Sequence, residues 1–290
     1  MDEAIELLER ALTIAPDSAV LRNNLGRAFV ENGRFEEALV HLNHALRINP
    51  RYNSALYNRG MALLGTGSLE TGWADWEHRV NADCTAKRSP TYGSLPMWQG
   101  ESLVGKRILV YAEQGLGDEL LFASCIPDLV KQGADVFLQC NPRLAPLFAR
   151  SFPGVTVHGG PRDEALEWLT EAGGVHVQSP AGSLARYLRR SLGDFPAANA
   201  YLRPDPNRVM YWRRRLAELG LGLNVGFAWR SRLQDPLRQR RYAQLSEWLD
   251  LFRLRGVNMI CLQYDDCDAE LAEVTNRNGV LMTRFPELEL

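Results

Sequence analysis

The sequence has few of the residues that build metal sites and disulfide frameworks. Its five cysteines are scattered and form no C-x-x-C pair, and none of its five histidines stands in H-E-x-x-H spacing. These absences exclude a zinc knuckle and a thioredoxin-type redox pair, and they argue against a metal held by protein ligands. We therefore expect no metal site.

Long apolar runs and an excess of positive charge are also missing. No stretch of about 18 apolar residues occurs, and the first residues lack the basic and apolar regions of a signal peptide. The 33 basic residues are balanced by 35 acidic ones, which gives a net charge of -2 and no basic field for nucleic acid. We expect a soluble, cytoplasmic protein that spans no membrane and binds no nucleic acid.

A repeat with a period of 34 residues fills the first 80 positions. Gly26 returns as Gly60, and the proline that closes one unit, Pro16, returns as Pro50. This pattern resembles the tetratricopeptide repeat, in which two helices form each unit and small residues lie where the helices touch. The resemblance implies a groove that binds a protein or peptide. Met1 falls in the second helix of a unit, so the first unit lacks its first helix. We therefore expect the array to continue upstream or to be stabilised by packing against the next domain.

The third unit of this array departs from the pattern. Trp73, Trp76 and Arg79 stand where the preceding unit has aliphatic or small residues. Aromatic residues three positions apart share one face of a helix. The two tryptophans therefore predict either a surface that docks on the next domain or a hydrophobic cap on the array.

From residue 105 onward, short apolar runs alternate with helical patterns, which predicts parallel α/β sheets. The expected strands are 107–111, 135–140, 155–157, 175–177, 224–229 and 257–262, and the expected helices are 119–132, 142–150, 183–191, 208–219 and 242–253. The predicted organisation is tetratricopeptide repeats at 1–83, a linker at 84–104, an N-terminal Rossmann-like domain at 105–205 and a partial C-terminal one at 206–290. The last holds so few strands that we expect the chain to be truncated or completed by another chain.

The turn after the first expected strand is the segment most suited to chemistry. Gly115 and Gly117 let a ligand approach the backbone, and the helix that follows offers free N–H groups and a positive dipole end. Leu120 stands where a dinucleotide-binding motif needs glycine, which disfavours a nucleotide-dependent oxidoreductase. Asp118 has two interpretations here: a helix N-cap, or a functional carboxylate at the edge of the sheet where α/β proteins bind ligands.

Residues 111–118 (YAEQGLGD) look like bacterial tetratricopeptide-repeat proteins that carry a glycosyltransferase-like domain, as do 72–79 (GWADWEHR) and 225–230 (VGFAWR). These proteins are related to the heptosyltransferases and more distantly to the O-linked N-acetylglucosamine transferases. The resemblance implies a GT-B architecture, with two Rossmann-like domains facing a cleft, a nucleotide-sugar donor and no cofactor. It also implies that Asp118 is the general base, beside a space for sugar that Gly115 and Gly117 leave open.

An arginine-rich loop follows the strand at 224–229. Arginine forks match phosphate oxygens, so Arg230 and Arg240 are the proposed contacts of the donor diphosphate, and a solvated basic loop is the alternative. The arginine run at 213–215 is interpreted as solvated surface. The segment that holds the nucleotide-sugar in the family has no counterpart within 263–290, so we expect this chain to be inactive alone.

Two functions therefore compete. The first is a glycosyltransferase-like protein, hexosyl- or heptosyltransferase-like if complete, that transfers sugar to a protein or glycan selected by the repeats. The second is a non-catalytic tetratricopeptide module for protein–protein interaction, in which the α/β part is structural.

Overall fold

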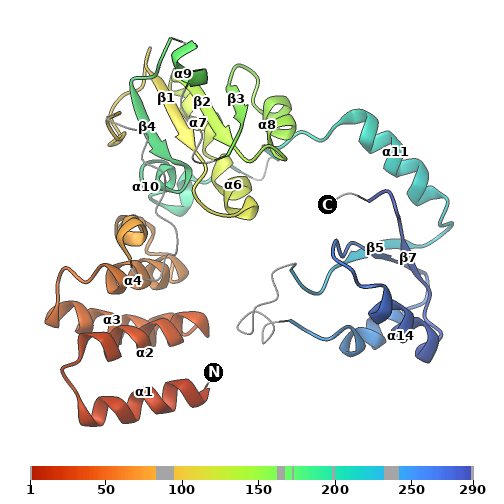
Figure 1. Cartoon of the computed structure of the whole chain (residues 1–290), viewed down its shortest axis with the longest axis horizontal. Coiled ribbons are helices and arrows are strands. Elements are labelled where there is room, and N and C mark those ends of the chain that lie inside the picture. Colours follow the sequence, from red (N-terminus) through yellow and green to blue (C-terminus); the bar gives the residue numbers. More distant parts are fainter. Residues whose placement is uncertain are drawn as a thin grey trace. The chain divides into compact units, whose positions relative to one another are not determined.

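The computed structural model describes residues 2–82, 95–161, 167–171, 173–197, 200–231 and 242–288. The chain divides into two compact units, Met1–Pro204 and Asp205–Leu290. Figure 1 shows the elements of both, and each unit is described here by itself.

The first unit begins with stacked helical hairpins. Their elements are α1 (Asp2–Ile14), α2 (Ala19–Glu31), α3 (Phe35–Ile48), α4 (Asn53–Gly65), α5 (Leu69–Trp76) and the 3-10 helix η1 (Glu77–Asn81). Two glycines explain the close packing: a Cβ on Gly26 would lie 2.5 Å from Leu42 Cγ, and one on Gly60 would lie 2.7 Å from the backbone nitrogen of Trp76. The 34-residue period thus repeats because each hairpin needs a small residue at the same crossing.

A parallel sheet follows the repeats in the same unit. Its strands are β1 (Arg107–Tyr111), β2 (Asp135–Cys140), β3 (Thr156–Gly159) and β4 (Val177–Pro180), in the order β3-β2-β1-β4. Ile108 and Val110 point into the larger core, whereas Leu109 and Tyr111 pack on the opposite face. Both faces are covered, as the continuous apolar run of β1 predicts.

Helices cover the two faces of this sheet. They are α6 (Leu116–Ala123), α7 (Ile126–Lys131), α8 (Ala145–Ser151), α9 (Glu167–Glu171) and α10 (Leu184–Leu188), with the 3-10 turns η2 (Ala181–Ser183) and η3 (Leu192–Asp194). The single helix expected at 119–132 is two helices, because Pro127 near the start of α7 has no N–H to continue the preceding one.

The segment 95–98 forms a strap along one edge of the sheet. Met97 bridges Gln178 of β4, the Trp98 N–H donates to the Gln178 carbonyl at 2.8 Å, and the Gln178 N–H donates to the Pro96 carbonyl at 2.9 Å. The strap therefore satisfies backbone groups that an open edge strand would expose.

Trp73 and Trp76 lie at the junction of the repeats and the sheet. Both are half-buried and pack against the core of the first sheet. Trp73 meets Phe122 edge to face, and its indole N–H donates to the Arg189 carbonyl at 2.9 Å. Of the two interpretations of these tryptophans, docking is the one that the contacts support.

The second unit holds a smaller parallel sheet of order β5-β6-β7. Its elements are α11 (Pro206–Ala217), β5 (Leu223–Phe227), η4 (Leu245–Trp248), α13 (Leu249–Phe252), β6 (Val257–Cys261), α14 (Asp268–Asn278) and β7 (Met282–Arg284). Phe227, Met259 and Phe252 are central to its core. The predicted fold class, helical hairpins followed by Rossmann-like parallel sheets, is confirmed.

Candidate functional site

The order of the first sheet identifies where α/β proteins bind ligands. The chain runs outward from β1 to β2 and β3 and then returns to the other side of β1 for β4. The carboxyl ends of β1 and β4 therefore flank the switch point of the topology, the crevice in which such sheets place ligands. Glu113 follows β1 at this edge, and Gly182 and Ser183 follow β4.

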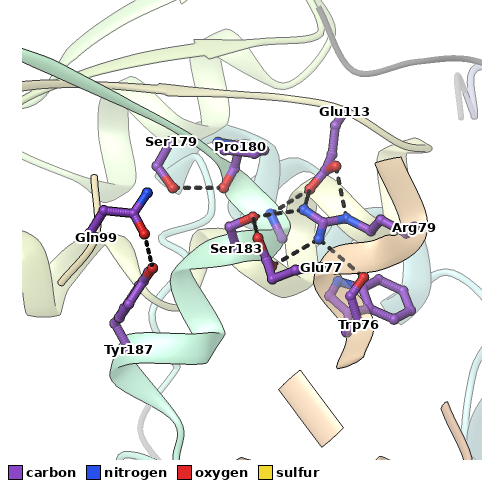
Figure 2. Close-up of polar contacts among 10 residues, drawn as sticks. Trp76, Glu77, Arg79, Gln99, Glu113, Ser179, Pro180, Ser183 and Tyr187 are labelled. Carbon is purple, nitrogen blue, oxygen red and sulfur yellow. Dashed lines mark hydrogen bonds and ion pairs between the residues drawn. The ribbon is translucent and has the colours of Figure 1, made fainter. Parts of the chain in front are cut away.

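A side chain from the repeats fills this crevice. The Arg79 guanidinium donates to both oxygens of Glu113, from Nε at 3.0 Å and from Nη2 at 2.7 Å. Nη2 also donates to Ser183 Oγ at 2.9 Å, and Nη1 donates to Glu77 at 2.9 Å. The Gly182 N–H completes the set by donating to Glu113 at 2.9 Å. We name this cluster, shown in Figure 2, the Arg79 clamp.

The Arg79 clamp is a buried ion pair. The side chains of Arg79 and Glu113 are 2% and 3% exposed. Burial disfavours the charged guanidinium, but the carboxylates of Glu113 and then Glu77 outweigh it and raise the pKa of Arg79. The guanidinium of Arg79 therefore stays charged, and removing its buried partner Glu113 would leave that charge uncompensated, at a cost of about 3–5 kcal/mol.

The turn at 115–118 lies beside the clamp, at the carboxyl end of β1. Helix α6 begins at Leu116, three residues earlier than the sequence predicts, and Gly115 is its N-cap. Asp118 occupies the third helical position and accepts the Gly115 N–H at 3.0 Å. Asp118 therefore does cap the helix, from inside the first turn, and its side chain is also partly exposed.

The fold does not itself require glycine at 115 or 117. The backbone of Gly115 is extended (φ -77°, ψ 172°), and Gly117 is not among the glycines with positive φ. A Cβ on Gly117 would have nothing within 4 Å, and one on Gly115 would meet only the Asp118 carboxylate at 3.5 Å. Alanine would fit both positions, so neither backbone strain nor packing explains these glycines.

A second carboxylate, Glu119, follows Asp118 and is buried. Its Oε2 accepts the N–H of Asn141, the residue after β2, at 2.8 Å. In the same way, buried Gln139 donates to the Pro161 carbonyl at 2.9 Å. Buried polar side chains thus fix the loops at this edge of the sheet.

In the second unit, Arg230 is held by carboxylates. Its Nε donates to Asp265 at 2.9 Å, its Nη1 donates to Glu270, and its Nη2 donates to the Asp266 carbonyl at 3.1 Å. Burial opposes its charge, but Glu270 and Asp265 outweigh burial and raise the pKa of the guanidinium. A diphosphate at Arg230 would therefore have to replace these partners.

An open pocket of about 640 Å³ adjoins Arg230. Its walls include Trp229, Tyr242, Glu270 and Arg277. Arg240, the other proposed phosphate contact, lies outside the described residues.

Sequence reasoning missed the Arg79 clamp. A sign of it was visible, because Arg79 stands one period after Ala45, a fully buried position of the repeat. A charged residue at a core position of a repeat needs a partner of opposite charge. Its partner, Glu113, lies in the 111–118 motif, but nothing in the sequence around Glu113 indicates that it contacts the repeats.

Two negative findings concern the described part of the chain. No group of three or more His, Cys, Asp or Glu side chains there is placed to hold a metal ion. None of the helices described is both long enough and apolar enough to cross a membrane.

Comparison with known proteins identifies the repeats. Residues 1–64 match the tetratricopeptide repeat family, so this part of the chain is a tetratricopeptide array. It also resembles a repeat-containing protein of Pseudomonas aeruginosa, with 33% identity over 81 residues (28% of this chain, 77% of that one). Such arrays bind protein segments, which supports a role in protein–protein interaction.

Nearly the whole chain aligns with protein FlbA of Caulobacter vibrioides. The two are 32% identical over 324 aligned residues, which cover 96% of this chain and 54% of FlbA. This chain thus spans about half the length of FlbA. Among solved structures, a mutant O-GlcNAc transferase of Thermobaculum terrenum matches over 97% of this chain and 70% of its own, with 15% identity and a TM-score of 0.31.

Proposed function

We propose that this chain is a glycosyltransferase-like protein whose repeats select a protein or glycan acceptor for sugar transfer from a nucleotide-sugar. The tetratricopeptide array supplies the recognition surface. The parallel sheet beside it supplies an edge of the kind at which α/β proteins bind ligands.

The observation that carries the proposal is the 115–118 turn. Its two glycines are required neither by backbone conformation nor by packing, and they leave the backbone open to close approach of a ligand. Because the Arg79 clamp fills the crevice between β1 and β4, the proposed acceptor site lies on the β1 side, at this turn. Asp118 is the partly exposed carboxylate there.

The proposed chemistry is a displacement at the anomeric carbon. The acceptor hydroxyl attacks that carbon while its proton moves to a carboxylate oxygen of Asp118. The bond from the anomeric carbon to the donor diphosphate breaks, and the electron pair leaves with the diphosphate. In the second unit, Arg230 and Arg240 are the residues that we propose to bind the diphosphate of a nucleotide-sugar, and Arg230 would exchange Asp265 or Glu270 for it.

Ligand-detected NMR with a panel of nucleotide-sugars, with and without an acceptor glycan, tests this proposal. We expect one donor to bind and the glycan to bind more weakly to Gly117→Ala than to the unmodified chain. Gly193→Ala is the matched control, since Gly193 lies in η3 and a Cβ there would meet only Ser191 Oγ at 3.7 Å. Absence of binding by every donor would refute the proposal.

A second candidate function is a non-catalytic protein-interaction module. Two observations favour it: Asp118 already accepts the cap hydrogen bond of α6, and the guanidinium of Arg230 already binds two carboxylates. A protein partner that binds the repeats, together with no binding of any nucleotide-sugar, would establish this alternative.

A further inference from the structure

The 115–118 turn is anchored by the repeats. Glu113 is the second residue after β1 and precedes Gly115 by two positions, so the chain reaches the turn directly from the Arg79 clamp. Both oxygens of Glu113 accept hydrogen bonds from Arg79, which belongs to η1, and one of them also accepts the Gly182 N–H. The start of the turn is thus fixed by a side chain of the last repeat.

The far end of the turn has its own support within the sheet domain. Asp118 accepts the Gly115 N–H, and the next residue, Glu119, accepts the N–H of Asn141. The turn is therefore held at two ends, from the repeats at Glu113 and from the β2 edge at Glu119. Only the first of these supports comes from outside the α/β fold.

Docking alone does not account for the Arg79 clamp. Trp73 already packs on Phe122 and donates to the Arg189 carbonyl, which joins the repeats to the sheet. Apolar residues in place of a buried ion pair often dock two surfaces as well or better. The guanidinium adds a fixed orientation for the Glu113 side chain, because its two N–H donors bind both carboxylate oxygens and so fix the plane of the carboxylate.

We propose that Arg79 is a positioning residue, through which the tetratricopeptide array sets the conformation of the 115–118 turn. The array then does more than bind a partner: its last element forms part of the framework of the candidate site. This inference concerns the turn itself and holds whether or not the chain transfers sugar.

Hydrogen exchange on the whole chain tests the proposal. In Arg79→Ala we expect amides of 112–119 to exchange about tenfold faster or more, relative to amides of β2 in the same protein. The matched control is Arg59→Ala, which removes a similar fork, from Arg59 to Asp75 at 2.6 and 3.2 Å, inside the repeats. It should leave the 112–119 amides unchanged.

Chemical rescue separates positioning from general loss of structure. Ethylguanidinium at low millimolar concentration should restore slow exchange at 112–119 in Arg79→Ala and leave the control unaffected. If Arg79→Ala does not fold, Arg79→Lys takes its place, because a lysine keeps the charge but cannot form the fork. Exchange at 112–119 equal to that of the unmodified chain in the folded Arg79 variant, or an equal rise in the control, would overturn the proposal.

Discussion

At the residue scale, the two roles of Asp118 can be separated by a conservative change. Asparagine keeps most of the capping ability but accepts no proton, so Asp118→Asn should alter the free energy of unfolding by less than about 1 kcal/mol. If Asp118 is the base, turnover of a nucleotide-sugar by a protein that also carries the donor-binding segment should fall about 10²-fold or more. Turnover and urea unfolding of the same variant measure the two effects.

Asp194 offers a matched control for this experiment. It is the third residue of η3 and accepts the Ser191 N–H at 2.7 Å, the arrangement that Asp118 makes with Gly115. Asp194→Asn should change stability by a similar amount and leave turnover as it was. If both variants turn over substrate as fast as the unmodified protein, Asp118 only caps the helix and is not the base.

His41 predicts a dependence of stability on pH in the repeats. Its ring stacks on Phe29, 5.4 Å between centroids, and burial together with the nearby Arg22 guanidinium lowers the pKa of His41 below its ordinary 6.5. The unfolded chain therefore binds the proton more readily than the folded one. Stability should be full above that ordinary value and fall as the pH drops through it toward the folded pKa.

Urea unfolding of the chain at about pH 7.5 and about pH 5.5 measures this effect. His41→Gln should reduce the loss at the lower pH. His44, whose pKa burial and Arg22 also lower, contributes in the same direction, so the double variant should flatten the profile further. A loss of stability unchanged by both substitutions would contradict the role of these histidines.

Residues of the candidate site were predictable where the pattern is local. Gly115, Gly117 and Asp118 are neighbours in one motif, and the structure brings them together in one turn. The partners of Arg230 could not be read in advance, because Asp265 and Glu270 lie on the loop and helix after β6. An arginine near a strand end fits a phosphate and a carboxylate equally well.

At the scale of elements, the junction between α5 and the sheet should depend on Trp73. Replacement by alanine removes its contacts with Phe122 and Trp76 and should lower the free energy of unfolding of the first unit by about 2–4 kcal/mol. Trp73→Phe keeps an aromatic ring but loses the hydrogen bond to Arg189, at a cost of about 1 kcal/mol.

Chemical unfolding followed by far-ultraviolet circular dichroism measures both variants. Trp212→Ala is the control, since Trp212 packs on Phe285 within the second unit. Trp212→Ala should not change the denaturant concentration at which the first unit unfolds. A loss below about 1 kcal/mol in Trp73→Ala would contradict the docking role.

The strands β1 and β2 were predicted at their observed bounds, because each is a short, mainly apolar stretch that lies between segments rich in glycine and polar residues. Helix α14 and strand β7 were not predicted: Met282–Arg284 is a three-residue strand with a single apolar residue. The sheet pairing that makes β7 a strand comes from β6, and no property of three residues alone reveals it.

At the scale of the whole molecule, the repeats and the first sheet should unfold together. They share one compact unit, joined by the Arg79 clamp, by Trp73 and by an ion pair between Glu70 and Arg190. Residues 1–204 produced alone should show one transition, the same for helical and tryptophan signals. Residues 95–204 alone should lose this cooperativity, because Glu113 would lose Arg79 and Phe122 would lose Trp73.

Native-state proteolysis and hydrogen exchange of the two fragments provide the measurement. Strand β1 amides protected equally in 95–204 and in 1–204 would show that the sheet folds without the repeats. The sequence suggested separate domains on either side of a linker. It could not reveal the shared unit, because the contacts that create it span 34 to 120 residues.

The Arg79 clamp also has a consequence for synthesis of the chain. Its residues are synthesised in three groups: Glu77 and Arg79 first, then Glu113, and finally Gly182 and Ser183. Ser183 follows Arg79 by 104 residues. At typical bacterial elongation rates this interval lasts roughly 5–20 s, during which the repeats fold next to a nascent chain that lacks β4. Until Glu113 and then Ser183 have been made, Glu77 in its own helix is the partner of the clamp that Arg79 can reach. The Arg79 clamp can form completely only after Ser183 has been made. We therefore expect the rate of translation between residues 79 and 183 to affect the yield of folded protein.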